Sequence, residues 1–239
     1  MNRSPAGRKA RADRRLAVDA AMVLGLLALM GRPYLAAPVH AWIGAGLTAL
    51  SAAHHLFSRG RYRGRRHTPL RTVQVALQVL LLAAVLALGY SGARMTWPAA
   101  ALWPAGGGLP LARRLHILGA YWGFLLMGLY LGVQWHTVLA AVRRRRPARA
   151  ARLDRASAWF VLALLVAGYG IWVVIKRDLL AYLFLQTEFV FYDYGEPAAL
   201  FYLDYLGLLG LWVFIGHYAA KSLRPPRPEH SAVQTGAER

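Results

Sequence analysis

The chain has 239 residues, of which 57% are hydrophobic and only 16% are charged, and its formal net charge is +19. Charged residues fall in blocks between long apolar runs, which is typical of a membrane protein and argues against a soluble domain. In a membrane protein such arginines mark topology and contact anionic lipid, so we expect no nucleic-acid partner. Because the sequence lacks cysteine, disulfides, iron–sulfur clusters and cysteine-ligated haem are excluded.

Six apolar segments predict an all-α protein, a polytopic membrane helix bundle. A spanning helix needs roughly 20 mostly apolar residues. In chain order the predicted helices cover residues 16–30, 33–58, 72–93, 115–142, 156–175 and 198–220. The first is short and follows a basic stretch, as in a signal peptide, but Asp19 lies inside it and Arg32 with Pro33 makes a poor cleavage site. We therefore expect a retained helix, with cleavage as the alternative.

The basic residues predict the orientation of these helices. With the N-terminus in the cytoplasm, 23 of the 29 Lys and Arg residues fall in cytoplasmic segments and 6 fall outside. Lys and Arg concentrate on the cytoplasmic side of membrane proteins, and an even number of helices puts both termini there. The sequence therefore predicts a multi-pass protein of the cell inner membrane, surrounded by lipid, with both termini cytoplasmic.

The segments between the helices complete the predicted organisation. Residues 95–111 are rich in Trp, Pro and Gly and should form an irregular loop, whereas residues 176–197 should lie on the outer surface as an interfacial helix and turn. We expect five regions: a basic cytoplasmic tail (1–15), a four-helix core (16–142), a basic cytoplasmic loop (143–155), two further spanning helices with the outer segment (156–223) and a disordered tail (224–239).

Histidines in the second predicted helix suggest a cofactor site. His40 and His54 are fourteen residues apart, which is roughly 21 Å along a helix and leaves them within about 40° of one another around it. His55 is a second choice beside His54. Two ligands on one face, one above the other, suit a two-haem membrane cytochrome, because imidazole is a common axial ligand of haem iron.

A partner for His40 is expected on the fourth predicted helix. His116 stands near the outer end of that helix, at the depth of His40, so we predict that the two ligate an outer haem b. Gly44 follows His40, and Gly119 and Gly123 follow His116 on its own face. These glycines would leave room for a flat macrocycle, although close packing of two helices would also explain them.

Eight stretches spread over nearly the whole chain carry a family resemblance. They are residues 40–44, the pair His54 and His55, and residues 112–127, 169–178, 182–188, 191–197, 203–205 and 216–218. They resemble the flavinylation-associated cytochrome family, bacterial membrane proteins related to di-haem b-type cytochromes. The resemblance implies a cytochrome-b-like four-helix core that binds haem b. It also implies an electron-transfer subunit that exchanges electrons with an extracytoplasmic protein bearing covalent FMN, with a quinone as a further candidate partner.

One position departs from the family pattern, which commonly has a histidine where this chain has Tyr130. Tyr130 follows His116 by fourteen residues, as His54 follows His40, so it occupies the place of the second ligand of an inner haem. The later His136 would lie roughly 9 Å too deep and about 160° round the helix. We therefore predict one haem, with the inner site vacant or abnormal.

Two other functions remain open on the sequence. A haem-free scaffold or transporter would use the histidines structurally or as proton carriers, and a membrane reductase would act on a small substrate outside. Among the remaining polar residues, we interpret Asp19, Asp204 and His217 as structural, and Lys176 and Arg177 as interfacial anchors.

Overall fold

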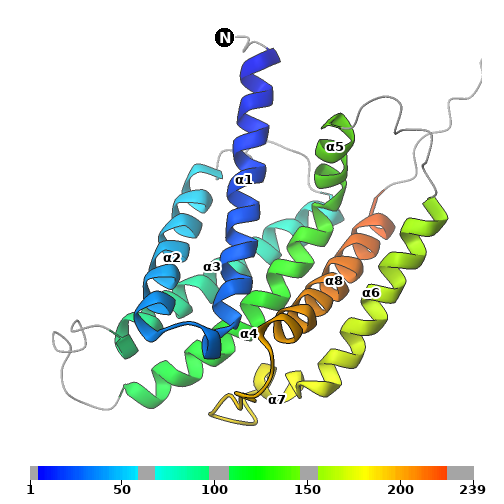
Figure 1. Ribbon diagram of the computed structural model, residues 1–239. Coiled ribbons are helices and arrows are strands. Elements are labelled where there is room, and N and C mark those ends of the chain that lie inside the picture. Colours follow the sequence, from blue (N-terminus) through cyan, green and yellow to red (C-terminus); the bar gives the residue numbers. More distant parts are fainter. Residues whose placement is uncertain (1–4, 59–67, 97–107, 146–155, 225–239) are drawn as a thin grey trace, which may run out of the picture.

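The computed structural model describes residues 5–58, 68–96, 108–145 and 156–224, and every regular element in these ranges is helical (Figure 1). The prediction of an all-α protein is thereby confirmed. The elements, in chain order, are α1 (Pro5–Met30), the 3-10 turn η1 (Arg32–Tyr34), α2 (Ala37–Ser58), α3 (Pro69–Thr96), α4 (Leu109–Val133), α5 (Trp135–Arg145), α6 (Ala156–Lys176), α7 (Leu179–Leu183) and α8 (Ala198–Ser222).

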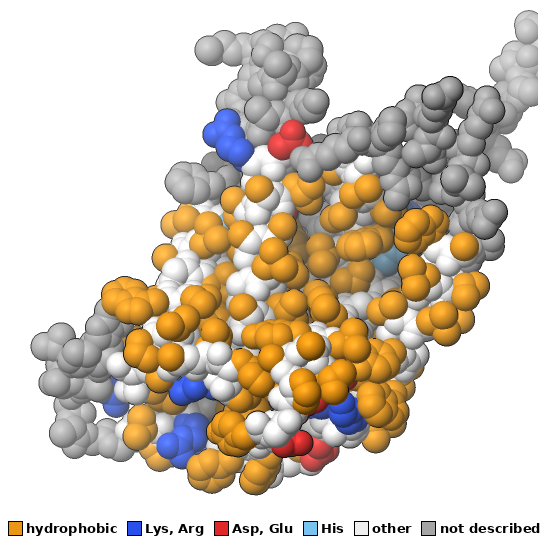
Figure 2. Space-filling model, viewed as in Figure 1, with side chains coloured by type: hydrophobic (Ala, Val, Ile, Leu, Met, Phe, Trp, Pro, Cys, Tyr) orange, Lys and Arg blue, Asp and Glu red, His pale blue; other side chains and the backbone are white. Residues whose placement is uncertain are grey.

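Four of the described helices are long and apolar enough to cross a membrane: α3, α4, α8 and the stretch Ala158–Lys176 of α6. The apolar part of α1, Leu16–Met30, is shorter. α2 has 22 residues, but it is not among these four helices. Figure 2 shows hydrophobic side chains over the middle of one face of the molecule, with charged side chains mainly near its two ends. This distribution is that of a helical membrane protein.

α4 is the central helix of the bundle. It packs along α3 on one side and along α8 on another, and α8 packs in turn against α6 (Figure 1). α2 packs mainly on α3 and α1. Because α8 contacts α4 as extensively as α3 does, the C-terminal helices are part of the central packing and do not merely flank a four-helix core.

Glycines bring the backbones of α4 and α8 into contact. A Cβ atom at Gly132 would collide with the carbonyl oxygen of Val213, and one at Gly216 would collide with the carbonyl oxygen of Leu129. Small residues at such crossings permit the close approach that gives membrane helices their van der Waals attraction. The crossing of α4 and α8 is therefore fixed by backbone contact at these two positions.

Several predicted boundaries shift in the structure. α1 begins at Pro5, so most of the predicted basic tail is helical. The helix predicted over 115–142 begins earlier, at Leu109, and is divided into α4 and α5 at Gln134, where ψ is 1°. The expected interfacial helix is only the five-residue α7, followed by turns up to α8. The predicted disordered tail lies outside the described residues, as does most of the predicted loop at 95–111.

α7 and the turns after it mark one end of the bundle, here named the α7 end; α5 marks the opposite end, the α5 end (Figure 1). α2, α4 and α8 start at the α7 end, whereas α1, α3 and α6 finish there. Every candidate residue of the sequence analysis can be placed relative to these two ends.

Candidate functional site

His40 and His116 face each other near the α7 end, one from the first turn of α2 and one from the second turn of α4. Their ring centroids are 6.2 Å apart and the ring planes are inclined by 51°. Bonds between a metal and an imidazole nitrogen are about 2 Å long, so two rings on opposite sides of one iron ion have centroids about 6 Å apart. The spacing of the pair is therefore one at which both imidazoles could hold the iron of a haem.

Ser91, a residue to which the sequence analysis gave no role, contacts this pair. It lies on α3, its side chain is fully buried, and its Oγ atom is 3.0 Å from Nδ1 of His116. The sequence signal for it was a hydroxyl group close to the apolar run 79–89, since a hydroxyl group inside a helix bundle needs a polar partner. The other ring is placed differently, since Nδ1 of His40 is buried without a hydrogen-bond partner among the described residues.

The three glycines near the pair have different surroundings. A Cβ atom at Gly44 would meet nothing within 4 Å, so the helix surface beside His40 is open. Gly119 and Gly123 instead face Ala84 and Leu88 of α3; a Cβ atom at Gly119 would be 3.1 Å from Cγ of Leu88. Close packing of α4 on α3 explains these two glycines, and only Gly44 borders free space that a flat cofactor could use.

The residues of the predicted inner site line one small pocket toward the α5 end. His54 and His55 enter it from α2 and Tyr130 from α4, as helix geometry had predicted for His54 and Tyr130. The remaining lining residues are Met22, Ser51, Gln78, Leu81, Val85 and Met127. The cavity of about 30 Å³ has room for a water molecule but not for a porphyrin.

Several polar side chains of this pocket contact other residues of the same chain. The Tyr130 hydroxyl accepts a hydrogen bond from Nε2 of Gln78 at 2.8 Å. Nε2 of His54 lies 3.5 Å from Oδ1 of Asp19, on α1. His136 does not line the pocket: it lies on α5, beyond the helix break at Gln134, and its Nε2 contacts Oγ1 of Thr137 at 3.3 Å. In this arrangement the inner site does not fit a haem.

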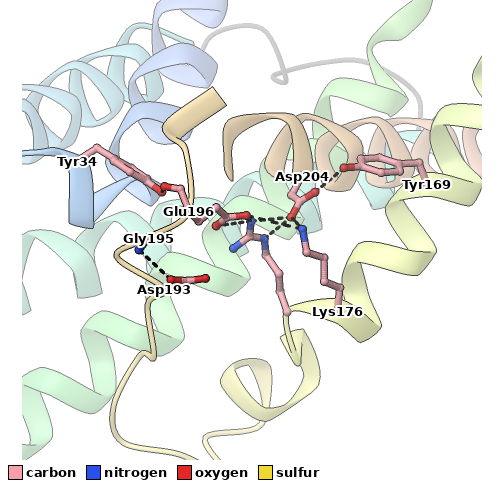
Figure 3. A network of polar contacts seen from close by, with 8 residues as sticks. Tyr34, Tyr169, Lys176, Asp193, Gly195, Glu196 and Asp204 are labelled. Carbon is pink, nitrogen blue, oxygen red and sulfur yellow. Dashed lines mark hydrogen bonds and ion pairs between the residues drawn. The ribbon is translucent and has the colours of Figure 1, made fainter. Parts of the chain in front are cut away.

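A second buried polar cluster lies at the α7 end, where α6 finishes and α8 starts (Figure 3). Asp204 of α8 is 1% exposed and accepts hydrogen bonds from Nζ of Lys176 at 2.7 Å and from Nε of Arg177 at 2.8 Å. The hydroxyl of Tyr169 donates to its other oxygen. Arg177 also holds both carboxylate oxygens of Glu196, at 2.7 and 2.9 Å. Two cations and two carboxylates thus balance one another.

The sequence analysis had taken Lys176 and Arg177 for interfacial anchors, which the structure corrects for Arg177. Its side chain is only 17% exposed. Burial would lower the pKa of the Arg177 guanidinium, but hydrogen bonds to Glu196 and Asp204 outweigh burial and raise that pKa above its ordinary value. The Tyr34 hydroxyl donates to the carbonyl oxygen of Glu196 at 2.8 Å, so the cluster also ties the turn between α1 and α2 to α8.

Comparison with protein-family models, with curated proteins and with solved structures found no match. Within the described residues, no group of three or more His, Cys, Asp or Glu side chains could hold a metal ion. A haem iron needs only two protein ligands, because the porphyrin supplies the others. Among the candidate sites, the His40–His116 pair has a ring spacing that suits such a group.

We predict that Asp204→Ala lowers the free energy of unfolding by about 3 kcal/mol, because it deprives the mostly buried Arg177 and the partly exposed Lys176 of the carboxylate that they share. The measurement is the thermal unfolding midpoint of the purified protein in detergent. Glu188→Ala is the matched control: Glu188 pairs with Arg114 at the same end, but both side chains are about half exposed. Loss of such an exposed pair costs about 1 kcal/mol or less. Equal midpoints for the two variants would contradict the structural role of the cluster.

Proposed function

We propose that the protein is a b-type haem electron-transfer subunit of the cell inner membrane. The observation that carries the proposal is the pair of His40 and His116, which come from two different helices and face each other with centroids 6.2 Å apart. Haem, when bound, supplies a one-electron carrier. The role of the chain in this proposal is to hold two neutral imidazoles at a fixed spacing and to surround them with apolar helices that keep water away.

In this proposal α1 and α2 also cross the membrane, which makes six spans. The α5 end is cytoplasmic and the α7 end faces outward. The support for this orientation is the distribution of Lys and Arg, of which 23 of 29 belong to segments at the proposed cytoplasmic end. The orientation puts the His40–His116 pair near the outer surface.

The proposed partner is an extracytoplasmic protein that bears covalent FMN. The family resemblance suggests this chemistry, and the place of the histidine pair, within two helical turns of the α7 end, suits exchange with a carrier outside. A quinol, which becomes a quinone as it gives up electrons, is the candidate donor that would complete the path. Dithionite-reduced protein should pass its electron to such a partner and not to the same partner stripped of FMN.

Reporter fusions test the orientation. We expect fusions at Arg63, Arg149 and the C-terminus to report the cytoplasm, because these positions lie in the basic segments. Fusions at Ala105 and Tyr192 should report the outside. Inverted results at any two of these positions would overturn the six-span arrangement.

The histidine pair is tested by replacing each member. We predict that His40→Ala and His116→Ala each abolish or severely reduce haem binding, because a low-spin b-type centre needs both axial imidazoles. Haem content per protein and the absorption bands of the reduced protein are the measurements. His217→Ala is the control, since His217 lies within α8 toward the α5 end, away from the pair, and its loss should leave the spectrum unchanged.

The outcome also separates the proposal from its rival. If both variants keep a normal low-spin spectrum, the ligand assignment is wrong. A wild-type protein that is colourless after expression with ample haem would favour the second candidate function, a haem-free transporter with proton-carrying histidines. The observation that favours this second function is the contact between His54 and Asp19, two ionisable groups that meet between α1 and α2.

The haem count tests the inner site. We expect a haem-to-protein ratio near one, because Tyr130 stands where an imidazole would be needed opposite His54. Tyr130→His should raise the ratio toward two, since it restores a second imidazole at that depth. Tyr130→Phe is the control that removes the hydroxyl without adding a ligand. A ratio of two in the wild type, with two low-spin signals, would contradict this prediction.

A further inference from the structure

Ser91 stands in a position that fixes the proton on His116. Its Oγ atom is 3.1 Å from the carbonyl oxygen of Leu88 and 3.0 Å from Nδ1 of His116. A serine hydroxyl has one proton to donate, and a carbonyl oxygen can only accept. Both contacts are hydrogen bonds only when Ser91 donates to Leu88 and His116 donates its Nδ1 proton to Ser91. In that tautomer Nε2 of His116 carries a free lone pair.

We propose that Ser91 is a positioning residue for the haem: it accepts the Nδ1 proton of His116 and so presents Nε2 of that ring to the iron. The inference rests on the proposed haem function and deepens it. A ligating histidine commonly donates its other N–H to a nearby acceptor, which fixes the ring orientation and makes the ligating nitrogen a stronger electron donor.

The packing of α3 on α4 keeps this hydrogen bond in place. Leu88, whose carbonyl receives the Ser91 proton, packs against Gly119, one turn along α4 from His116. Gly92 follows Ser91, and a Cβ atom there would be 3.9 Å from Cε1 of the His116 ring, so the ring lies against the surface of α3. The hydrogen bond therefore lies within the close contact between α3 and α4.

The two candidate ligands therefore differ. His116 is held through Nδ1 by a side chain that is fully buried, whereas Nδ1 of His40 has no hydrogen-bond partner among the residues the structure describes. His116 is thus the ring whose tautomer a neighbouring side chain fixes, so loss of the Ser91 hydroxyl should act on His116 and not on His40.

The experiment compares Ser91→Ala and Ser91→Cys with the wild-type chain, each expressed in full length and purified in detergent. Haem affinity is measured by titration of the haem-depleted protein with haemin, and the midpoint potential is measured on the haem-bound fraction. Ser51→Ala is the matched control, because Ser51 is also a buried serine of a neighbouring helix, but its hydroxyl contacts Sδ of Met22 and it lines the separate pocket toward the α5 end.

Ser91→Ala should weaken haem affinity roughly ten- to a hundredfold. It should also shift the midpoint potential to more positive values, because a less electron-rich imidazole stabilises ferric iron less. Ser91→Cys should fall between wild type and Ser91→Ala, since a thiol is a weak acceptor. Ser51→Ala should match the wild type in both measurements.

The inference is overturned if Ser91→Ala has the affinity and potential of Ser51→Ala, or if its potential moves in the negative direction. That failure is distinct from failure of the proposed function, which would appear as a wild-type chain that binds no haem at all. A poorly folded alanine variant does not obscure the result, because the potential is read from the haem-bound fraction and Ser91→Cys preserves the side-chain volume.

Discussion

Close packing on both faces of α4 is the constraint on which the rest of the structure depends. Lipid is as apolar as a leucine side chain, so membrane helices associate through close van der Waals contact and not through hydrophobic burial. α4 meets this condition twice: Gly119 and Gly123 admit α3, and Gly132 lies against the backbone of α8. The resulting three-helix layer carries, on one side, the Ser91–His116 contact and, on the other, the cluster around Asp204.

The two polar arrangements at the α7 end differ in how the burial of their polar groups is compensated. The charges around Asp204 are compensated among themselves, so their burial is tolerable only as a complete set. The histidine pair needs no counter-charge when both rings are neutral, but Nδ1 of His40 has no hydrogen-bond partner in the part of the chain that the structure describes. Such a deficit is costly in a membrane and is more often found at sites that serve a ligand than at sites that serve packing.

Sequence reasoning succeeded where helix geometry alone decides the outcome. Apolar runs located the long helices, because lipid forces the backbone to satisfy its own hydrogen bonds. Fixed rise and rotation per residue predicted that His40 would match His116 in depth and that Tyr130 would stand opposite His54. The contacts of Ser91 could not be foreseen in this way, since they depend on how α3 is rotated against α4. The break at Gln134 was missed because no proline marks it.

The central place of α8 also bears on how the protein is made. α8 is synthesised after all the other described helices. Until α8 is present, the side of α4 around Gly132 lacks the helix that packs on it. Before Glu196 and Asp204 are synthesised, Arg177 has neither of these carboxylate partners, because both follow it in the chain. The bundle therefore closes late in synthesis, and a chain interrupted before residue 196 would have Lys176 and Arg177 without either carboxylate and the Gly132 side of α4 without α8.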